Sequence, residues 1–570
     1  MKRTHRYLLP QIFAVVLLVG AMRMGVAADA VEAMPRGKGT HADLVALLDE
    51  FLNWQDPARA KGNNDYWLLE TAGSDNASDF SPAAVEQRRE KMRALQAKLA
   101  DMNVAAWNRK QQVEYLAVRA RFDQEDFTLN VSKPWSRDPG FYVDEMLRVT
   151  FTELPVKGDK LKATRNELRS MPKLIAHAKQ NLTEVAADYA DLAMFNLANA
   201  DGVGHGFPYR AVPPPGVIGW YADLLGRAEK QQRDLVPDIK AAKKAAEDLL
   251  AWIKANRGSM TAQAGVGREN FDWYLKNVKM MPYDADQIVV LGHRELDRLW
   301  ALYGLEQHRN RNLPPLKISA SKEDYEAKIA ATDEHVRKFL VEQDIITIPP
   351  YIKELDTNVP WIVRPTGPNF WEQIQFRDPH PDHLHAVIPG HRFDAIVERN
   401  NTDPIRSKLT DGARVEGWGV YLEEGMLHAG IFEDRPRVRE LIYLFGIFRA
   451  ARVPADVWLQ LNQMKVADVV KYWMERTPYL EPDVARVDAE IYLRRPPGYG
   501  LGYMIGMLQM QELLADSKRQ AGDKFVLKDF HDKFMAAGRL PLSLIRWEMT
   551  GLDDEVKNFW AHDPLPAAAR

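Results

Sequence analysis

The 570-residue sequence contains 76 basic and 79 acidic residues, a formal net charge of −3, and 14 histidines. The nearly balanced charge lacks the excess of basic residues that marks nucleic-acid binding, so we expect no nucleic-acid partner. The absence of cysteine excludes disulfides, cysteine nucleophiles, cysteine-ligated zinc and lipid-modified cysteines. Hydrophobic residues make up 46% of the chain, which is ordinary for a globular protein.

Residues 1–30 have the pattern of a secretory signal peptide. Lys2, Arg3 and Arg6 precede an apolar run over 12–22, and small residues follow. The run is shorter than the roughly 20 residues that a membrane-spanning helix needs. We therefore expect a periplasmic or secreted protein with no membrane contact after cleavage. An uncleaved N-terminal anchor is the alternative.

Helical patterns dominate after a lead-in over residues 31–40 that we expect to be flexible. Ser81-Pro82 is a typical helix start, and Ser321 begins a helix expected to end near residue 342. From Asp238 to Asn256 the apolar residues share one face, with Asp238 as the expected cap. We interpret 41–570 as a single helical domain, built as one body or as two lobes around a cleft.

Strand signals are few. Ile345–Ile348 is a short β-branched run, and Leu316–Ser319 is a second strand candidate; together they predict a small β-sheet beside the helical body. Long loops over 205–216 and 359–371 are rich in proline, glycine and aromatic residues, and ordered loops of this length are often functional. The expected fold class is mainly α: a large helical body with a small β-sheet and a central cleft for a peptide or small-molecule substrate.

The stretch over residues 381–394 is the most informative about chemistry. It places His383, His385 and His391 within nine residues. His385 and His391 are six residues apart, which is about 120° around an ideal helix. Both can reach one ion only if the helix is broken between them. Pro389-Gly390 predicts such a break, because proline removes a backbone donor and glycine permits unusual dihedrals.

A distant acid completes a ligand set. Two histidines and a separate glutamate, with a fourth position open, are usual ligands of a catalytic zinc. We expect His385, His391 and Glu416 to hold one Zn²⁺, although other divalent ions bind such donors.

The helix that carries this acid has further features. Glu423 lies seven residues after Glu416, on the same face, and Glu423 or Tyr421 is expected to orient a histidine. Gly417 and Gly419 are expected to let a neighbouring helix come close.

Three motifs follow one another in a characteristic order. They are His385-Ala-Val-Ile-Pro-Gly-His391, Glu416-Gly-Trp-Gly-Val-Tyr-Leu-Glu423 and Pro497-Gly-Tyr-Gly-Leu-Gly-Tyr-Met-Ile-Gly506. The chain from about 41 to 560 thereby resembles the bacterial domain-of-unknown-function family 885, whose usual patterns are H-E-x-x-P-G-H, E-G-W-A-L-Y-A-E and P-G-Q-A-x-x-Y-x-I-G.

That family is similar to helical gluzincin metallopeptidases of the angiotensin-converting-enzyme type. The resemblance implies a mostly α-helical body with a deep cleft and a zinc site. It also implies His385, His391 and Glu416 as ligands. Tyr503 matches the family tyrosine and is expected to stabilise an oxyanion.

The sequence departs from the family pattern at a position that matters for mechanism. Ala386 stands where the family has the glutamate that takes a proton from water. Either another carboxylate replaces that glutamate, with Asp394, Glu398 and Glu423 as candidates, or the protein hydrolyses peptides poorly. A lesser departure is Tyr499, which replaces the glutamine of P-G-Q-A.

These observations support competing functions. The first is an exported metal-dependent hydrolase, a zinc peptidase-like protein with a non-standard general base. Arg494 or Arg495 would bind a substrate carboxylate, or would be a structural or solvated pair. The alternative is a catalytically impaired pseudo-peptidase that acts as a peptide-binding or scaffold protein. A third reading is a helical protein whose histidines bind no metal.

Overall fold

The computed structural model describes residues 33–55, 80–199 and 211–566, and the predicted signal peptide lies outside these ranges. The described chain is mainly α-helical, as expected. Its N-terminal helices are α2 (His41–Gln55), α3 (Pro82–Ala100), α4 (Arg109–Phe127), α5 (Pro134–Arg137), α6 (Gly140–Leu147), α7 (Gly158–Asn181), α8 (Ala187–Ala198), α9 (Gly216–Gln231) and α10 (Val236–Asn256).

The chain continues through helices that carry the predicted site. These are α11 (Arg268–Asn277), α12 (Ala285–Arg309), α13 (Lys322–Glu342), α14 (Phe370–Gln375), α15 (His380–Asp382), the π-helical turn η6 (His383–Val387), α16 (His391–Arg399), α17 (Gly412–Ala429), α18 (Pro436–Gln460), α19 (Val466–Arg476), α20 (Pro482–Arg494), α21 (Leu501–Ala521), α22 (Leu527–Ala536) and α23 (Leu542–Thr550).

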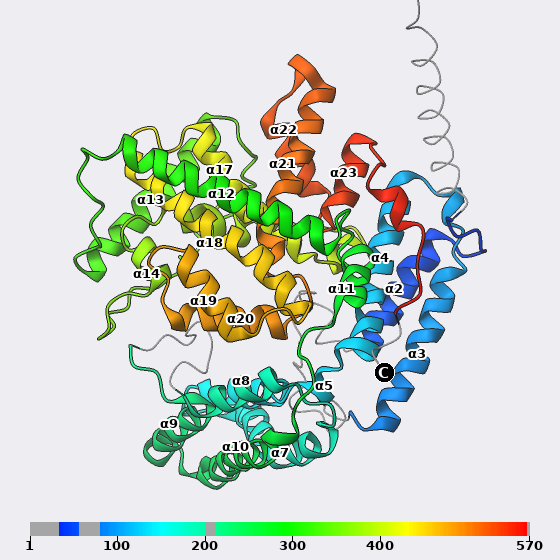
Figure 1. The fold of residues 1–570 in the computed structure, drawn as a ribbon, viewed down its shortest axis with the longest axis vertical. Helices are drawn as coiled ribbons and strands as arrows, with labels where there is room; N and C mark the ends of the chain where they lie inside the picture. Colours follow the sequence, from blue (N-terminus) through cyan, green and yellow to red (C-terminus); the bar gives the residue numbers. More distant parts are fainter. Residues whose placement is uncertain (1–32, 56–79, 200–210, 567–570) are drawn as a thin grey trace, which may run out of the picture.

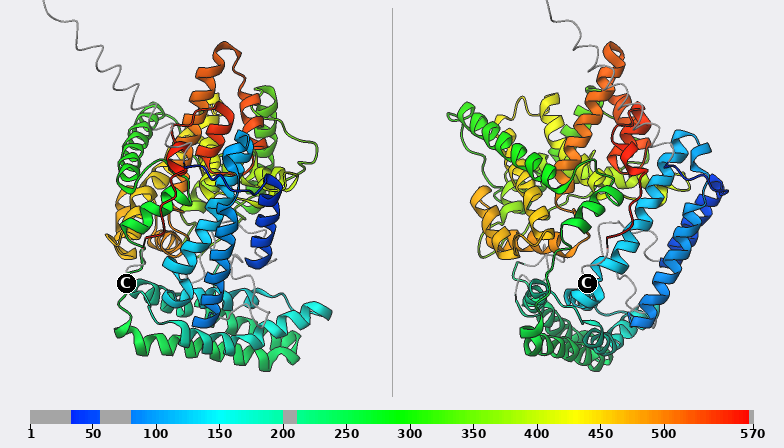
Figure 2. Two further views of the ribbon diagram at one scale, coloured as in Figure 1. Left: turned by 90° about the vertical axis from the view of Figure 1, so that its right-hand side faces the viewer. Right: turned by 45° about the vertical axis from the view of Figure 1, so that its right-hand side comes forward.

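The helices are arranged in three parts, which Figure 1 shows. Helices α7 to α10 pack against one another as a layer at one end of the molecule, and α2 to α4 stand along one side. The larger body contains α12 packed on α18 and α17 packed on α21. The end of α21 and the start of α22 project from this body, as the turned views in Figure 2 also show.

A single continuous hydrophobic core joins these parts. It extends from Leu44 of α2 to Trp560 near the C-terminus. A small second cluster gathers around Phe127 and Tyr274. Helix α18 is buried over most of its length, so it passes through the centre of the larger body.

Local capping explains the helix starts that the sequence predicted. The Ser81 hydroxyl accepts a hydrogen bond from the Ala84 amide at 3.3 Å, and the Ser321 hydroxyl accepts one from the Asp324 amide at 3.3 Å. The expected cap at Asp238 is wrong, because α10 begins two residues earlier at Val236. Asp238 instead forms an ion pair with Arg169 at 2.8 Å.

The predicted β-sheet is absent from the described residues, which contain only isolated bridges such as Gly39 with Met102. In 345–348 the backbone groups find partners other than a neighbouring strand. The Thr347 amide donates to Asp532 Oδ1 at 2.9 Å, and the Ile345 carbonyl lies 2.7 Å from His531 Nδ1. The side chains of Ile345 and Ile346 are buried without the need for strand pairing.

The lead-in is held by hydrogen bonds where the structure describes it. The amides of Lys38 and Gly39 donate to the Asp101 carbonyl at 2.7 and 2.8 Å. The Asn103 amide donates in turn to the Gly39 carbonyl at 2.9 Å. Residues 37–39 of the lead-in thus contact the end of α3, and the flexibility of the lead-in stays a prediction.

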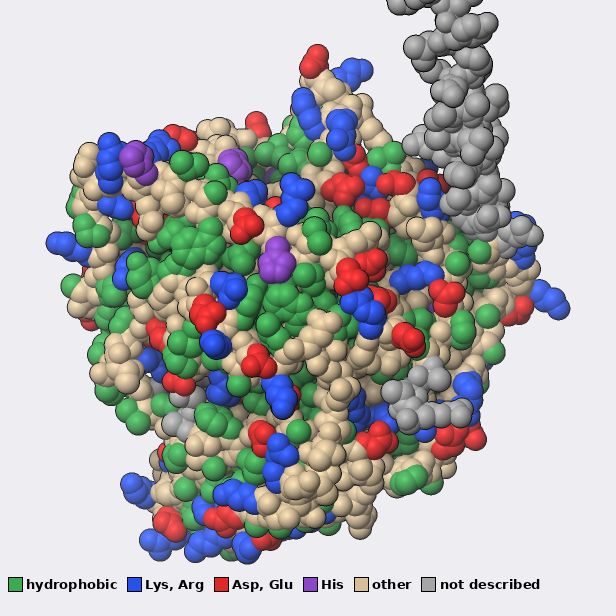
Figure 3. Space-filling model, in the orientation of Figure 1, with side chains coloured by type: hydrophobic (Ala, Val, Ile, Leu, Met, Phe, Trp, Pro, Cys, Tyr) green, Lys and Arg blue, Asp and Glu red, His purple; other side chains and the backbone are tan. Residues whose placement is uncertain are grey.

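Charged side chains of both signs are interspersed over the face shown in Figure 3, with hydrophobic side chains between them. Among the described residues, no helix combines the length and the apolar character needed to cross a membrane.

Candidate metal centre

A break in the helix sets the positions of His385 and His391. His385 lies in the π-helical turn η6, and His391 is the first residue of α16. Between them the chain leaves the helical conformation at Ile388. Gly390 lies so close to this turn that an added Cβ would be 1.9 Å from the His385 carbonyl oxygen, so a side chain does not fit there. The predicted Pro-Gly interruption is present.

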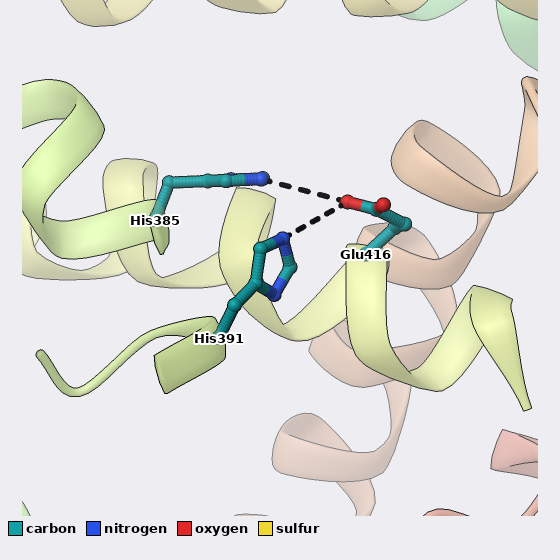
Figure 4. Close-up of side chains that lie close together, drawn as sticks. All are labelled: His385, His391 and Glu416. Carbon is teal, nitrogen blue, oxygen red and sulfur yellow. Dashed lines mark hydrogen bonds and ion pairs between the residues drawn. The ribbon is translucent and has the colours of Figure 1, made fainter. Parts of the chain in front are cut away.

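The break brings the three predicted ligands together, as Figure 4 shows. Glu416 Oε2 lies 3.1 Å from His391 Nε2 and 3.5 Å from His385 Nε2. One donor atom of each residue lies within 4.8 Å of the other two. The His391 side chain is 27% exposed, so the group can be reached from solvent.

Small residues on α17 permit this approach. Gly417 of α17 meets Gly506 of α21, and an added Cβ on Gly417 would lie 2.4 Å from the Gly506 carbonyl carbon. An added Cβ on Gly506 would lie 2.2 Å from the Ala413 carbonyl oxygen. Gly417 therefore lets the two helices cross closely, as expected. Gly419 has a different role, because a Cβ there would lie 2.6 Å from Nδ1 of His385. Gly419 makes room for the imidazole rather than for a helix.

Glu423 and Arg449 fix the orientation of the His385 ring. Glu423 Oε1 lies 2.9 Å from His385 Nδ1, and its other oxygen pairs with the Arg449 guanidinium. Arg449 also approaches Nδ1 at 3.3 Å. A carboxylate on Nδ1 favours the tautomer with the proton on that nitrogen, which leaves Nε2 free to bind a metal. Glu423 is thus placed to orient the ring, on the side away from Glu416.

The charges of the site fit this arrangement. Burial tends to raise the pKa of Glu416, but His391 and His385 offset this and hold that pKa well below its ordinary value. Burial and Arg449 tend to lower the pKa of His385, whereas Glu416 and Glu423 raise it, and the net pKa is raised. The metal-free site therefore favours an ionised carboxylate beside a protonated imidazole.

Two tyrosines of the Pro-Gly-Tyr motif lie beside Glu416. The Tyr499 hydroxyl donates to Glu416 Oε1 at 3.2 Å and lies 3.2 Å from the Tyr503 hydroxyl. The Tyr503 ring lies parallel to that of His385, with 6.4 Å between centroids. Burial and Glu416 raise the pKa of Tyr503 well above its ordinary value, so its hydroxyl stays protonated and can donate a hydrogen bond.

The start of α21 is anchored to α18 and thereby positions these tyrosines. Asp456 Oδ2 accepts a hydrogen bond from the Leu501 amide at 3.0 Å. Burial raises the pKa of Asp456 to about 7. Arg452 of the same helix stands 4.9 Å from the centre of the Tyr503 ring and pairs with Asp488 at 2.5 Å.

The structure does not bring Asp394 to the ligand group. Asp394 Oδ1 lies 3.0 Å from Arg414, and Oδ2 accepts from Arg539 at 2.9 Å. Because Asp394 is on α16 and Arg414 on α17, this ion pair ties together the helices that carry His391 and Glu416.

Other sequence candidates also have partners elsewhere. Glu398 accepts a hydrogen bond from Asn401 at 3.2 Å, and the Tyr421 hydroxyl lies 2.8 Å from His531 Nε2. His383 Nε2 lies 3.0 Å from Asp333 Oδ1. Arg494 pairs with Asp138, Asp144 and Glu490, so its role here is structural.

Sequence reasoning missed Arg449 and Asp382. Arg449 is a buried cation within the apolar run of α18, and an arginine in such a run was a signal that could have been used. Asp382 lies one turn before His385, and burial raises its pKa. Its proximity to the histidine pattern was visible, but its surroundings were not.

The central cleft stays a prediction. A hollow of about 470 Å³ lies between the loop before α17 and helices α22 and α23, and its lining does not include the three candidate ligands.

The residues present fit a bound divalent metal. Two imidazole nitrogens and one carboxylate oxygen lie within 4.8 Å of one another, and two histidines with one carboxylate are a usual ligand set for zinc with one open position. Glu423 provides the carboxylate–histidine contact that accompanies such ligands.

Comparisons with known proteins support the fold. One solved structure, of a candidate lipoprotein of unknown function from Shewanella oneidensis, is 17% identical, with a TM-score of 0.67 over 90% of this chain and 100% of that chain. Another, from Colwellia psychrerythraea, is 17% identical, with a TM-score of 0.66 over 92% of this chain and 100% of that chain. No curated protein matches the chain.

The family assignment comes from a match over more than half of the chain. The model described as "Bacterial protein of unknown function (DUF885)" matches residues 62–306 and 383–549. The second range contains all three candidate ligands, both tyrosines and Arg449. The chain therefore belongs to the bacterial DUF885 family.

Proposed function

We propose that this protein is an exported, metal-dependent hydrolase that acts on peptides. The observation that carries this proposal is the convergence of His385, His391 and Glu416 within 4.8 Å, with the His385 ring oriented by Glu423. Zn²⁺ held by these donors would polarise a scissile carbonyl and acidify a water molecule. The similarity to gluzincin metallopeptidases noted from the motifs supports the same reaction class.

The residues around the ligands have definable tasks. Glu416 is ionised, and Tyr499 holds its Oε1, which leaves Oε2 directed at the two imidazoles. The protonated Tyr503 hydroxyl would donate to the oxyanion that forms when water adds to the carbonyl carbon. Ala386 cannot take the proton from water, so the base must be non-standard.

Metal binding and turnover test the proposal separately. Purified protein without a histidine tag is loaded with Zn²⁺, dialysed and analysed for metal content. We expect about one ion per chain by the ligand count of such sites, and loss of the ion in His391→Ala. Zinc-dependent cleavage of a peptide library, abolished by His391→Ala, would support hydrolysis. A stoichiometry near zero would contradict the metal site.

The second candidate function is a pseudo-peptidase that binds peptides without cleaving them. Ala386 favours it, because general acid–base catalysis is typically worth about 10²–10⁴-fold in rate. Zinc bound at full stoichiometry without cleavage, in both the wild type and Ala386→Glu, would favour this alternative. Isothermal titration with the same peptides would then measure binding directly.

We also propose an extracytoplasmic location. The signal-peptide pattern of residues 1–30 and the description of both structural neighbours as candidate lipoproteins support it. The sequence has no cysteine to carry a lipid, so a lipid anchor of that kind does not apply to these 570 residues. N-terminal sequencing of protein recovered from the periplasm or medium would locate the cleavage after Ala28 or Ala30.

A further inference from the structure

Asp382 occupies the helical face that the missing catalytic glutamate would occupy. It is the last residue of α15, and the π-helical turn begins at the next residue. Ala386 follows four residues later, which is close to one turn in either kind of helix. Side chains at 382 and 386 therefore share a face. In H-E-x-x-H proteins, the residue after the first histidine carries the water-activating carboxylate.

The carboxylate of Asp382 is held at one oxygen only. Asn358 donates a hydrogen bond to Oδ1 at 3.2 Å. Oδ2 is buried and has no hydrogen-bond partner among the described residues. An unpaired buried acceptor destabilises the folded protein, and groups of this kind often have a functional reason.

The charges around Asp382 belong to the candidate metal centre. His385 and Arg449 favour its ionised form, and Glu423 opposes it. Burial outweighs them and raises the pKa of Asp382. These interactions show that the Asp382 carboxyl lies in the electrostatic neighbourhood of His385, one of the candidate ligands.

The other carboxylates considered for this task have partners that occupy them. Both oxygens of Asp394 contact arginines. Glu423 is on the Nδ1 side of His385 and pairs with Arg449. Glu398 accepts a hydrogen bond from Asn401 at Oε1, and it lies on α16, beyond the break that separates this helix from the turn with position 386. Oε1 of Glu423 also forms no hydrogen bond, but it contacts His385 Nδ1 at 2.9 Å. Asp382 remains as the carboxylate on the face of position 386 whose buried oxygen has neither a hydrogen bond nor an ion pair among the described residues.

We propose that Asp382 is the general base that replaces the glutamate absent at position 386. The inference rests on the proposed hydrolase function. Oδ2 takes a proton from a water molecule as the water oxygen bonds to the scissile carbonyl carbon. The same proton then passes from Oδ2 to the leaving amine nitrogen as the C–N bond breaks. The carboxylate is regenerated, and no oxidant or further reactant is needed.

The main test compares Asp382→Asn with Asp356→Asn in the zinc-loaded full-length protein. Asp356 is a fully exposed carboxylate of the loop that contains Asn358, and it serves as the matched control. We expect Asp382→Asn to lower kcat for peptide cleavage by about 10²–10⁴-fold, with unchanged zinc content, and Asp356→Asn to retain activity. Activity of Asp382→Asn within threefold of wild type would overturn the inference.

Rescue distinguishes a base from a structural residue. Adding Ala386→Glu to Asp382→Asn should restore most of the lost kcat, because the carboxylate returns to the same face. In the wild-type background, Ala386→Glu should change kcat by less than about tenfold, since a base is already present. A gain in kcat of about 100-fold or more from Ala386→Glu alone would overturn the inference while leaving the hydrolase site intact. If Asp382→Asn does not fold, the Ala386→Glu variant alone tests the inference.

A readout without turnover separates failure of this inference from failure of the proposed function. Co²⁺ replaces the zinc, and its visible absorption is titrated with pH. We expect Asp382→Asn to shift the titration midpoint, because a carboxylate that accepts a hydrogen bond from water changes the acidity of that water. Identical midpoints would overturn the role of Asp382, whatever the peptides do. A shifted midpoint without peptide cleavage would support the role of Asp382 beside the metal and would contradict only the proposed hydrolase function.

Discussion

At the scale of single residues, the direction of each carboxylate decides its role. Glu416 and Glu423 lie on one helix face, yet Glu416 meets the Nε2 atoms and Glu423 meets Nδ1 of His385. The sequence predicted that both acids point the same way. It could not show that Arg449 claims one oxygen of Glu423, because Arg449 lies 64 residues from His385 in the chain.

The orienting role of Glu423 predicts an effect on metal affinity. Glu423→Gln keeps the size of the side chain but removes the charge that holds Nδ1–H and balances Arg449. We expect zinc affinity to fall by about 10–100-fold, measured by competition with a chelator. Glu433→Gln, an exposed glutamate beyond α17, is the control. Equal affinities of the two variants would argue against this role.

His531 predicts a loss of stability in acid. Burial lowers the pKa of His531 to about 4, and its two nitrogens lie near the Tyr421 hydroxyl and the Ile345 carbonyl. Between that value and about 6.5, the unfolded chain binds more protons than the folded one. The contribution of neutral His531 to the free energy of unfolding is therefore complete above pH 6.5. It is lost as pH falls toward 4, and the loss is about 3 kcal/mol at most.

Urea denaturation at pH 4.5 and pH 7 measures this effect. His531→Gln cannot gain the proton, so its unfolding free energy should change less between the two pH values than that of the wild type. The difference between the two proteins is the informative quantity, since other groups titrate in both. An equal pH dependence would show that His531 is not responsible.

At the scale of elements, helix starts were predictable because caps are local. Ser81 and Ser321 bond to amides three residues away. The strand prediction at 345–348 failed because its backbone partners, His531 and Asp532, come from α22, far away in the sequence. For the close crossing of α17 and α21, the sequence predicted the role of Gly417 on α17 but not the role of Gly506 on α21.

That crossing predicts a destabilising substitution. Gly506→Ala would place a Cβ 2.2 Å from the Ala413 carbonyl oxygen, so the helices must separate. We expect a loss of about 1–3 kcal/mol in unfolding free energy and weaker zinc binding, because α17 carries Glu416. Gly304→Ala in α12 is the control: nothing lies within 4 Å, and alanine there should be neutral or stabilising. Thermal unfolding and chelator competition measure both effects.

At the scale of the whole molecule, one core joins the N-terminal helices to the body that holds the candidate ligands. The mainly helical class followed from periodicity, whereas the arrangement of the layers depends on contacts between distant segments.

We expect zinc to raise the unfolding temperature of the full chain, since a ligand at 100 times its Kd adds about 2.7 kcal/mol to the free energy of unfolding. Calorimetry with and without zinc tests this, and His391→Ala should not respond.

The anchoring of α21 by Asp456 has a consequence for biogenesis. The imidazoles and Glu416 come from a stretch between residues 385 and 416, but the tyrosine that steadies Glu416 arrives with residue 499. A nascent chain that has emerged only as far as α17 thus contains all three donor residues, but it lacks the Tyr499 contact that positions Glu416. We expect any ion to be captured late, after the chain from α18 to α21 has docked, and hence on the far side of the membrane for an exported chain.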